Sequence, residues 1–410
     1  MAVGTSNLTN YASAFKRLYT TRTYQELMYE GRPLLGMMPK NTNFRGSMCE
    51  VHVDQGGSAS RGHTFSSSQT YAATGRGSVF SVTRVQDFQS MYIDRQGWKA
   101  SKGDDGAFFD LKKREMNGAL RNLADNAHME LFRDGSAIRG IVGSESTTSL
   151  VLATPQDIKN FAIDMEVQVA AAGGSSVRSG TATITAIDYE NYTLTTDTNW
   201  TSQIASLVAT DEIYQHGDID AGISGVAAWI DSSAGTLFGV TRTTDPYPLA
   251  GIWYTGTGML YSVAIRKALH YASSFKSQGK KVGFVNPLVF SELLDEIGDK
   301  VRYNKMYAKG NGGKKIAHID YDVITISSPF GDVEIVSDHQ CQTNRIWLLC
   351  LEDWEFKTLG PFPDDLLDTG VTGALPVYNA DSIELRRGWY GNAICHKPIN
   401  NIGITITAPT

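Results

Sequence analysis

The segment 46–98 most constrains the fold, because it contains two strand patterns separated by a long polar stretch. Cys49–Val53 alternates as a β-strand does, and Val79–Val85 followed by Gln89–Ile93 returns to that pattern. Between them, Gly56–Gly62 opens a mostly polar run that favours a mobile tip. We predict a long two-stranded ribbon. Such a ribbon is marginally stable alone, so we expect it to rest on a neighbouring molecule; an ordinary hairpin at a sheet edge is the alternative.

Residues 1–45 predict an extended arm with one or two short helices. Apolar residues recur at helical spacing early in this segment, and helix-breaking residues follow at Gly31, Pro33, Gly36 and Pro39. The arm has too little apolar surface to form a domain, so we expect it to lie across something else.

Residues 104–134 have the clearest helical periodicity. Apolar side chains recur at spacings of three, four and seven, at Phe109, Met116, Leu120, Leu123, Ala127 and Leu131. Asp104 and Asp105 can cap the start, and Gly135 is a suitable stop. About 30 residues give a helix of about 45 Å, which suits a beam across a flat domain. A coiled-coil seam is disfavoured because Asp134 is charged.

Residues 144–217 differ in charge and in pattern. Nine acidic and two basic residues lie between 144 and 215, whereas residues 1–48 contain six basic and two acidic ones. A basic segment and an acidic segment on one chain can face different partners. Ordinary variation of surface charge explains the difference equally well. Short strands are expected at Met165–Val169, Thr181–Ile187 and Tyr192–Thr195. We predict a small β-barrel or sandwich inserted into a host domain.

The rest of the chain alternates helices and strands. A helix is expected at Met259–Gln278, with Gly279 as its stop, and a buried strand at Val282–Val285. Asn286–Pro287 has the N-cap and first-turn proline of a second helix, which ends at Gly298. Further strands are expected at Val323–Ile326, Asp332–Val336, Ile346–Leu351, Ser382–Arg386, Ala393–Cys395 and Ile402–Ile406. These patterns predict an α+β fold.

Composition excludes several broad classes of protein. Hydrophobic residues make up 41% of the chain, enough for packed cores, but no apolar run approaches the about 20 residues of a membrane span. A net charge of −6 provides no general basic surface for nucleic acid. No signal peptide is apparent. The four cysteines, Cys49, Cys341, Cys350 and Cys395, have no zinc or disulfide spacing, so we expect synthesis in a reducing cytoplasm.

Short motifs give no catalytic site. Gly310–Lys315 lacks the first glycine and the Ser or Thr of a phosphate loop, and Gly256–Gly258 is followed by Tyr261 where a dinucleotide fingerprint needs a small residue. His318, Asp320 and Asp322 offer hard-metal ligands on one strand face, although a polar face is the simpler interpretation. Asp364–Asp365 indicates a turn. We therefore assign no catalytic, cofactor-binding or metal-binding residue and expect no cofactor.

The order of these parts resembles the major capsid proteins of tailed bacteriophages, whose Hong Kong 97-like fold encapsulins share. Four stretches are similar to segments of those proteins in their local residue pattern: Ala250–Tyr254, Ile346–Trp354, Asp381–Leu385 and Gly391–Pro398. The resemblance covers nearly the whole chain. It implies an N-terminal arm (1–45), an extended β-hairpin E-loop (46–98), a peripheral domain with a long spine helix (99–143), an inserted small β-domain (144–217), an axial domain (218–374) and a return to the peripheral domain (375–410).

The function implied by the resemblance is structural, and we expect no enzyme. Such a subunit self-assembles into pentamers and hexamers of an icosahedral head around double-stranded DNA, and it lies in the virion capsid after assembly in the host cytoplasm. The implied partners are other copies of the chain, a portal and a cement protein. Assembly would use a separate scaffolding protein or no scaffold. The packaged DNA would lie near the subunit without specific binding, and no membrane is implied. The acidic insertion is expected to face outward. No lysine lies between Gly46 and Trp98, which disfavours crosslinking through an E-loop lysine.

Three alternatives remain from the sequence. An encapsulin-like compartment would enclose protein cargo. A tail-tube or fibre subunit is disfavoured by the long helix at 104–134. A polysaccharide-acting enzyme would need paired carboxylates, and no pair is identified.

Overall fold

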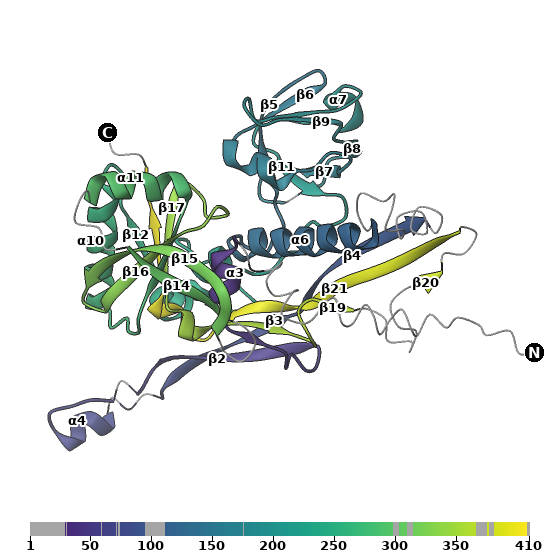
Figure 1. The fold of residues 1–410 in the computed structure, drawn as a ribbon. Coiled ribbons are helices and arrows are strands. Elements are labelled where there is room, and N and C mark those ends of the chain that lie inside the picture. The colour runs from purple at the N-terminus through teal and green to yellow at the C-terminus, as the bar shows by residue number, and fades with distance from the viewer. Residues whose placement is uncertain are drawn as a thin grey trace, which may run out of the picture. The chain divides into compact units, whose positions relative to one another are not determined.

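The computed structural model describes residues 29, 31–58, 60–70, 72, 74–94, 111–174, 176–297, 303–309, 315–365, 375–376 and 381–407 of the 410-residue chain (Figure 1). The chain divides into two compact units. Met1–His128 with Trp229–Thr410 forms the first, and Met129–Ala228 forms the second. No helix among the described residues is long and apolar enough to cross a lipid bilayer.

One long strand organises the first sheet of unit 1, here called the β21 sheet. β21 (Ser382–Cys395) pairs with β4 (Val85–Asp94), β18 (Trp354–Thr358), β19 (Asp364–Asp365) and β20 (Leu375–Pro376), and β1 (Lys40–Asn41) pairs with β18. The side chains of β4 alternate, so that Met91 and Ile93 are buried on one face while Phe88 and Tyr92 are exposed on the other. This period of two is that of a sheet with one covered face.

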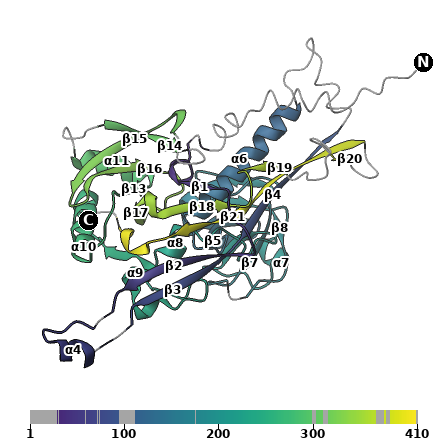
Figure 2. The same cartoon turned by 90° about the horizontal axis from the view of Figure 1, so that it is seen from below.

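The covered face lies against α6 (Leu111–Leu131), as Figure 2 shows. Asn126 on α6 donates a hydrogen bond of 2.8 Å to Asp87, which shares the face of Met91. The apolar stripe of α6 is buried, at Met116, Ala119, Leu120, Leu123, Ala124, Ala127 and Leu131. The predicted helix is confirmed here, and residues 104–110 lie outside the described part. α6 ends at Leu131 rather than at 134, and Gly135 follows with a φ of +98°.

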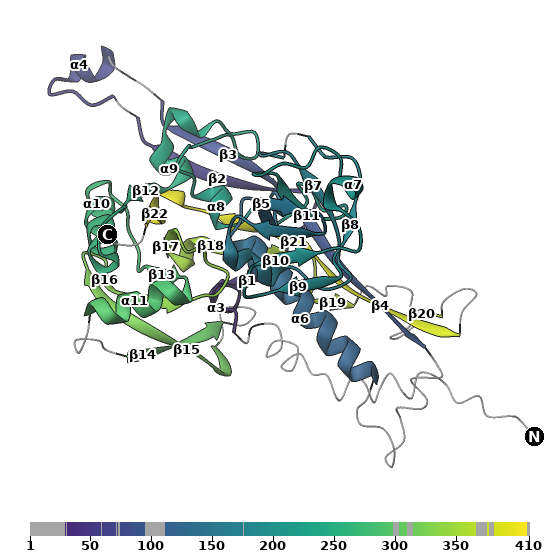
Figure 3. The ribbon, with the colours of Figure 1, turned by 90° about the horizontal axis from the view of Figure 1, so that it is seen from above.

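The two-stranded ribbon predicted for 46–98 is present over Met48–Thr83, but Gln89–Ile93, which was expected in its returning strand, pairs with another sheet. β2 (Met48–Gly56) and β3 (Arg76–Thr83) pair antiparallel as a separate two-stranded sheet, while β4 continues the chain into the β21 sheet. The tip contains α4 (Phe65–Thr70), a short helix with no buried residue, where a mobile polar loop was expected. Figure 3 shows α4 at the far end of the ribbon.

The base of the ribbon packs on its own chain, contrary to the expectation that it rests on a neighbour. Val51, Val53, Phe80 and Val82 share one face of the ribbon and are all buried. The ring centroid of Phe80 lies 5.2 Å from that of Trp229. Self-burial therefore anchors the base of the ribbon.

The described part of the arm is also buried within unit 1, so the expectation that it lies across another molecule is wrong for residues 31–45. All five residues of α3 (Pro33–Met37) are buried, as is Phe44. β1 pairs parallel to β18, with Lys40 opposite Phe356. This short segment buries enough apolar surface to be held by its own chain. Residues 1–28 lie outside the described part.

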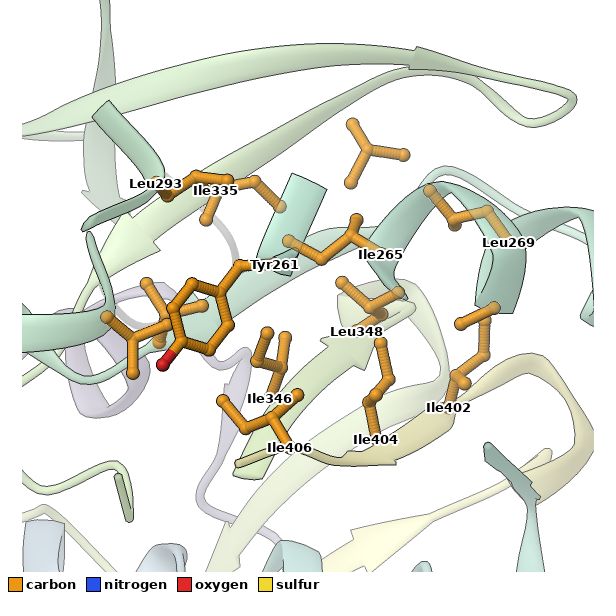
Figure 4. Close-up of a cluster of buried hydrophobic side chains, with 14 of the residues drawn as sticks. Tyr261, Ile265, Leu269, Leu293, Ile335, Ile346, Leu348, Ile402, Ile404 and Ile406 are labelled. Atoms are coloured by element: carbon orange, nitrogen blue, oxygen red, sulfur yellow. The ribbon is translucent and has the colours of Figure 1, made fainter. Parts of the chain in front are cut away.

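The second sheet of unit 1, the β13 sheet, contains seven strands. Their order is β12 (Ile252–Thr255), β22 (Ile402–Thr405), β17 (Arg345–Leu349), β13 (Val282–Val285), β16 (Gly331–Ser337), β15 (Lys315–Ser328) and β14 (Tyr303–Lys309). All four residues of β13 are buried, as its apolar run predicts. α10 (Tyr261–Ser274) and α11 (Pro287–Ile297) contribute to the core under this sheet (Figure 4).

Local signals place the two helices beside this sheet. The Asn286 side chain accepts a hydrogen bond of 3.0 Å from the Leu288 amide, which confirms the predicted start of α11. α10 begins where the carboxylate of Glu296 accepts the amides of Tyr261 and Ser262, at 2.7 and 2.8 Å. α10 ends at Ser274, four residues before the predicted end at Gln278, so Gly279 is not its stop; Lys276, with a φ of +62°, follows the helix end instead.

The sheets divide the chain differently from the expected boundaries. β22, within the expected peripheral return at 375–410, pairs with β12 and β17 in the β13 sheet. β18, within the expected axial domain at 218–374, belongs to the β21 sheet. The two strands predicted at Ser382–Arg386 and Ala393–Cys395 form the single strand β21. Asp364–Asp365 is strand β19 rather than a turn, because it pairs with Gly388 and Arg387.

Unit 2 is a seven-stranded β structure with its own core. The order is β8 (Ala182–Thr183), β7 (Glu166–Ala170), β11 (Glu212–Gln215), β5 (Gly140–Ser146), β6 (Ser149–Leu152), β10 (Thr193–Thr195) and β9 (Ala186–Asp188). β7 and β10 are at the predicted strands Met165–Val169 and Tyr192–Thr195, whereas the predicted strand Thr181–Ile187 is split into β8 and β9 at opposite edges of the sheet. Trp200 in α7 (Trp200–Gln203) is fully buried, and its indole N–H donates to the Thr148 carbonyl at 3.1 Å.

Short helical segments complete the described structure. They are η1 (Pro155–Asn160), α8 (Val226–Trp229), η2 (Arg242–Thr244), α9 (Pro246–Ala250), η5 (Leu351–Asp353) and η6 (Pro398–Asn400).

Candidate assembly surfaces

The tip of the ribbon presents an aromatic side chain to solvent. Phe65, the first residue of α4, is 78% exposed. The helix that carries it is capped, because the Thr64 hydroxyl accepts a hydrogen bond of 3.2 Å from the Ser67 amide. Aromatic residues are enriched in protein interfaces because they bury a large apolar area. The tip is thus an ordered element that displays an uncovered apolar group.

The face of the β21 sheet opposite α6 forms a second candidate surface. Phe88 and Tyr92 point to this face from β4, and the edge of the Phe88 ring contacts Tyr390 of β21, with centroids 5.4 Å apart. The guanidinium of Arg386 donates two hydrogen bonds to Glu384, at 2.7 and 3.0 Å. These bonds lower the pKa of Glu384. The face therefore combines exposed aromatic rings with an ion pair, as protein interfaces commonly do.

A buried polar joint ties three distant segments of unit 1 together. His128 at the end of α6 lies 2.8 Å from Asp338, which follows β16, and both side chains are fully buried. The other contacts of Asp338 are the Leu34 amide of α3 at 3.2 Å and the Gln340 amide at 3.0 Å. Burial raises the pKa of Asp338, but the charge and hydrogen bond of His128 and the Gln340 amide outweigh it, so the pKa is lowered. Asp338 is therefore an ionised carboxylate held by three donors.

A buried lysine completes the attachment of the arm. The Lys40 ammonium donates to the carbonyls of Leu35 and Met38, at 2.5 and 3.1 Å, and lies 4.2 Å from the centre of the Tyr29 ring. It thus satisfies carbonyls at the end of α3. Burial lowers the pKa of Lys40 to about 7.

The partial motifs of the sequence do not converge on one site. Gly256–Gly258 does precede α10, but the first amides of that helix are taken by Glu296, which leaves them unavailable to a phosphate. His318, Asp320 and Asp322 lie on β15, and their side chains are outside the described part, as are residues 310–314. The four cysteines form no disulfide.

Sequence reasoning expected the ribbon to contact a neighbour, but it missed Phe65, the open face of the β21 sheet and the buried joint. The exposed face of β4 had a detectable signal, because Phe88 and Tyr92 alternate with Met91 and Ile93. The His128–Asp338 pair had none, since 210 residues separate its members.

Comparison with known proteins identifies the fold. No protein-family model matches the chain, and no curated protein matches it either. The capsid asymmetric unit of cyanophage A-1(L) is similar in structure, with 13% identity, a TM-score of 0.52 and coverage of 91% of this chain and 92% of that chain. At this identity the match shows the fold alone: the chain has a mixed α/β fold with several sheets that matches phage capsid folds.

Two further structures align over most of the chain at lower TM-scores. The capsid of Myoviridae phage XM1 has 7% identity, a TM-score of 0.46 and coverage of 92% and 93%. The holo-SrpI encapsulin of Synechococcus elongatus PCC 7942 has 7% identity, a TM-score of 0.43 and coverage of 99% and 96%.

Proposed function

We propose that this chain is the major structural subunit of a bacteriophage head. Copies assemble into pentamers and hexamers of an icosahedral shell that encloses double-stranded DNA. The observation that carries the proposal is the projecting ribbon of a capsid-type fold, with its base buried on its own chain and Phe65 exposed at its tip. An aromatic ring held in solvent on an ordered helix does not stabilise a monomer. In a lattice of copies the same ring can be buried against a neighbour and stabilise the assembly.

The proposed contact joins the ribbon tip of one copy to the open face of the β21 sheet of the next. Phe65 would pack near Phe88 and Tyr92 of the neighbour, and the Glu384–Arg386 pair would provide polar contacts at the rim. Full burial of one such ring contributes about 1.5–3 kcal/mol. Repetition of the contact around every capsomer makes the shell stable by mass action although each contact is modest.

Charge is consistent with a container rather than a DNA-binding protein. The chain has a net charge of −6. Tight phosphate binding needs many Lys and Arg side chains and becomes weak as salt rises. A net-acidic wall holds DNA by confinement and releases it when the shell is opened.

In this proposal unit 1 forms the wall, and its two sheets correspond to the peripheral and axial parts of a Hong Kong 97-like subunit. Unit 2 is an acidic insertion on the outer surface, where it is available to a cement protein. A separate scaffolding protein and a portal would complete the head.

The test is assembly of the full-length chain with Phe65 changed to Asp. Because Phe65 makes no buried contact within its own chain, we expect F65D to remain folded, with the melting temperature of the wild type, but to form no closed shells in negative-stain micrographs. Val208→Asp in unit 2, at an exposed apolar residue outside the proposed contact, is the matched control and should assemble normally.

A shortened ribbon tests the same contact independently. Gly56 and Arg76 are paired across the ribbon, so replacing residues 57–75 with Asn-Gly closes it with a two-residue turn. We expect a soluble, folded protein without shells. Normal particles from both variants would contradict the proposed contact, and wild-type particles from the native host that contain protein cargo without nuclease-protected DNA would favour a compartment instead.

A further inference from the structure

Three side chains at the buried joint have the chemistry and the spacing of a metal site. His128, Asp338 and His339 each offer one ligand atom, and these three atoms all lie within 4.8 Å of one another. His128 and Asp338 are buried, and His339 is partly exposed. They come from two places in unit 1, the last turn of α6 and the turn after β16.

The groups are already oriented toward one another. The rings of His128 and His339 are in contact, with centroids 5.1 Å apart. Asp338 uses its two oxygens to accept the amides of Leu34 and Gln340, so the carboxylate is fixed by backbone hydrogen bonds. Outer hydrogen bonds of this kind hold a carboxylate ligand in place and contribute to metal affinity.

We propose that His128, Asp338 and His339 bind one zinc ion. Two imidazole nitrogens and one carboxylate oxygen are a ligand set that zinc takes in proteins, with a fourth position left for water. Zinc binds the Nε2 lone pair of a neutral imidazole that carries its ring proton on Nδ1. A proton on Nε2 therefore leaves to solvent from an imidazolium, or is exchanged through solvent to Nδ1, and the His128–Asp338 hydrogen bond is replaced by one bond from zinc to Nε2 and one to the carboxylate. The ion then links α6, the helix beside the β21 sheet, to the turn that follows β16 of the β13 sheet. This zinc site is independent of the proposed shell function.

The test is zinc binding by the purified full-length chain after removal of metals with a chelator. We expect one zinc ion per chain by isothermal titration and by elemental analysis, together with a rise in melting temperature when zinc is added. His339→Gln removes the partly exposed ligand and leaves the buried pair, so it should melt like the wild type in chelator. We expect it to lose at least about tenfold in zinc affinity and to lose the zinc-dependent rise in melting temperature.

His396→Gln is the matched control. His396 also pairs with a carboxylate, Glu355, at 3.2 Å on the surface of unit 1, but it belongs to no group of three ligands among the described residues. H396Q should bind zinc as the wild type does. The proposal is overturned if the wild type binds less than one equivalent with no change in melting temperature, or if H339Q and H396Q bind zinc equally. Either result would identify His128–Asp338 as a structural hydrogen bond only.

Discussion

His128 Nε2 and Asp338 Oδ2 lie 2.8 Å apart with both side chains fully buried, although 210 residues separate them in the chain. Asp338 also accepts the Leu34 amide, so one carboxylate joins α6, the turn after β16 and the arm. The two sheets of unit 1 and the arm are therefore connected at one point.

Removal of this carboxylate should destabilise unit 1 strongly. Asp338→Ala leaves a buried imidazole and two buried amides without their acceptor, which costs about 3–5 kcal/mol. Urea unfolding in chelator measures the change. Glu50→Ala is the control, because Glu50 and its partner His52 are both exposed and the change should cost about 1 kcal/mol or less. Equal losses in the two variants would contradict a central role for Asp338.

Lys40 should make stability rise with pH above neutrality. Its folded-state pKa is about 7, whereas a lysine in an unfolded chain titrates near about 10.4. Between these values the unfolded state binds more protons than the folded state, so the free energy of unfolding increases as pH rises. We expect Lys40→Met to flatten this increase between about pH 7 and 9.5 in urea titrations. Lys280→Met, at an exposed lysine, should leave the slope unchanged; parallel curves for the wild type and K40M would show that Lys40 does not titrate in this range.

Two glycine-to-alanine changes should have opposite signs. A Cβ on Gly225 would overlap the backbone carbonyl oxygens of Leu131 and Glu130, which cannot move without disturbing α6. We expect Gly225→Ala to lower the free energy of unfolding by about 1–3 kcal/mol. Gly118 lies within α6 with open space around it, so Gly118→Ala should raise that free energy by about 0.5–1 kcal/mol. Thermal unfolding of the two variants gives the comparison, and a destabilised G118A would contradict the exposed position assigned to this residue.

Glu296 should act as the cap of α10 from another helix. Its carboxylate accepts the amides of Tyr261 and Ser262 at the helix start. We expect Glu296→Ala to cost about 1–2 kcal/mol in chemical unfolding, because those amides lose their partner. Asp295→Ala, next to it on α11 and exposed, should change stability by less than about 0.5 kcal/mol. A similar, small effect of both changes would mean that water replaces the carboxylate without penalty.

Local patterns in the sequence predicted most individual elements. The alternation in Cys49–Val53 and Val79–Val85 predicted the ribbon, and the stripe from Met116 to Leu131 predicted α6. Asn286–Pro287 predicted the start of α11. These features depend on residues a few positions apart, so their backbone preference is present before the chain folds.

Partners across the chain were decided by tertiary structure alone. Periodicity predicted a strand at Ile402–Ile406, but not that this strand would lie between β12 and β17 rather than with β21. The self-burial of α3 and of Val51 and Phe80 also depended on surfaces formed elsewhere. By itself the sequence determined which residues form helices and strands and which of their faces avoid water, because those are local properties. Which surfaces meet, including His128 with Asp338, is fixed only when all surfaces compete for burial at once.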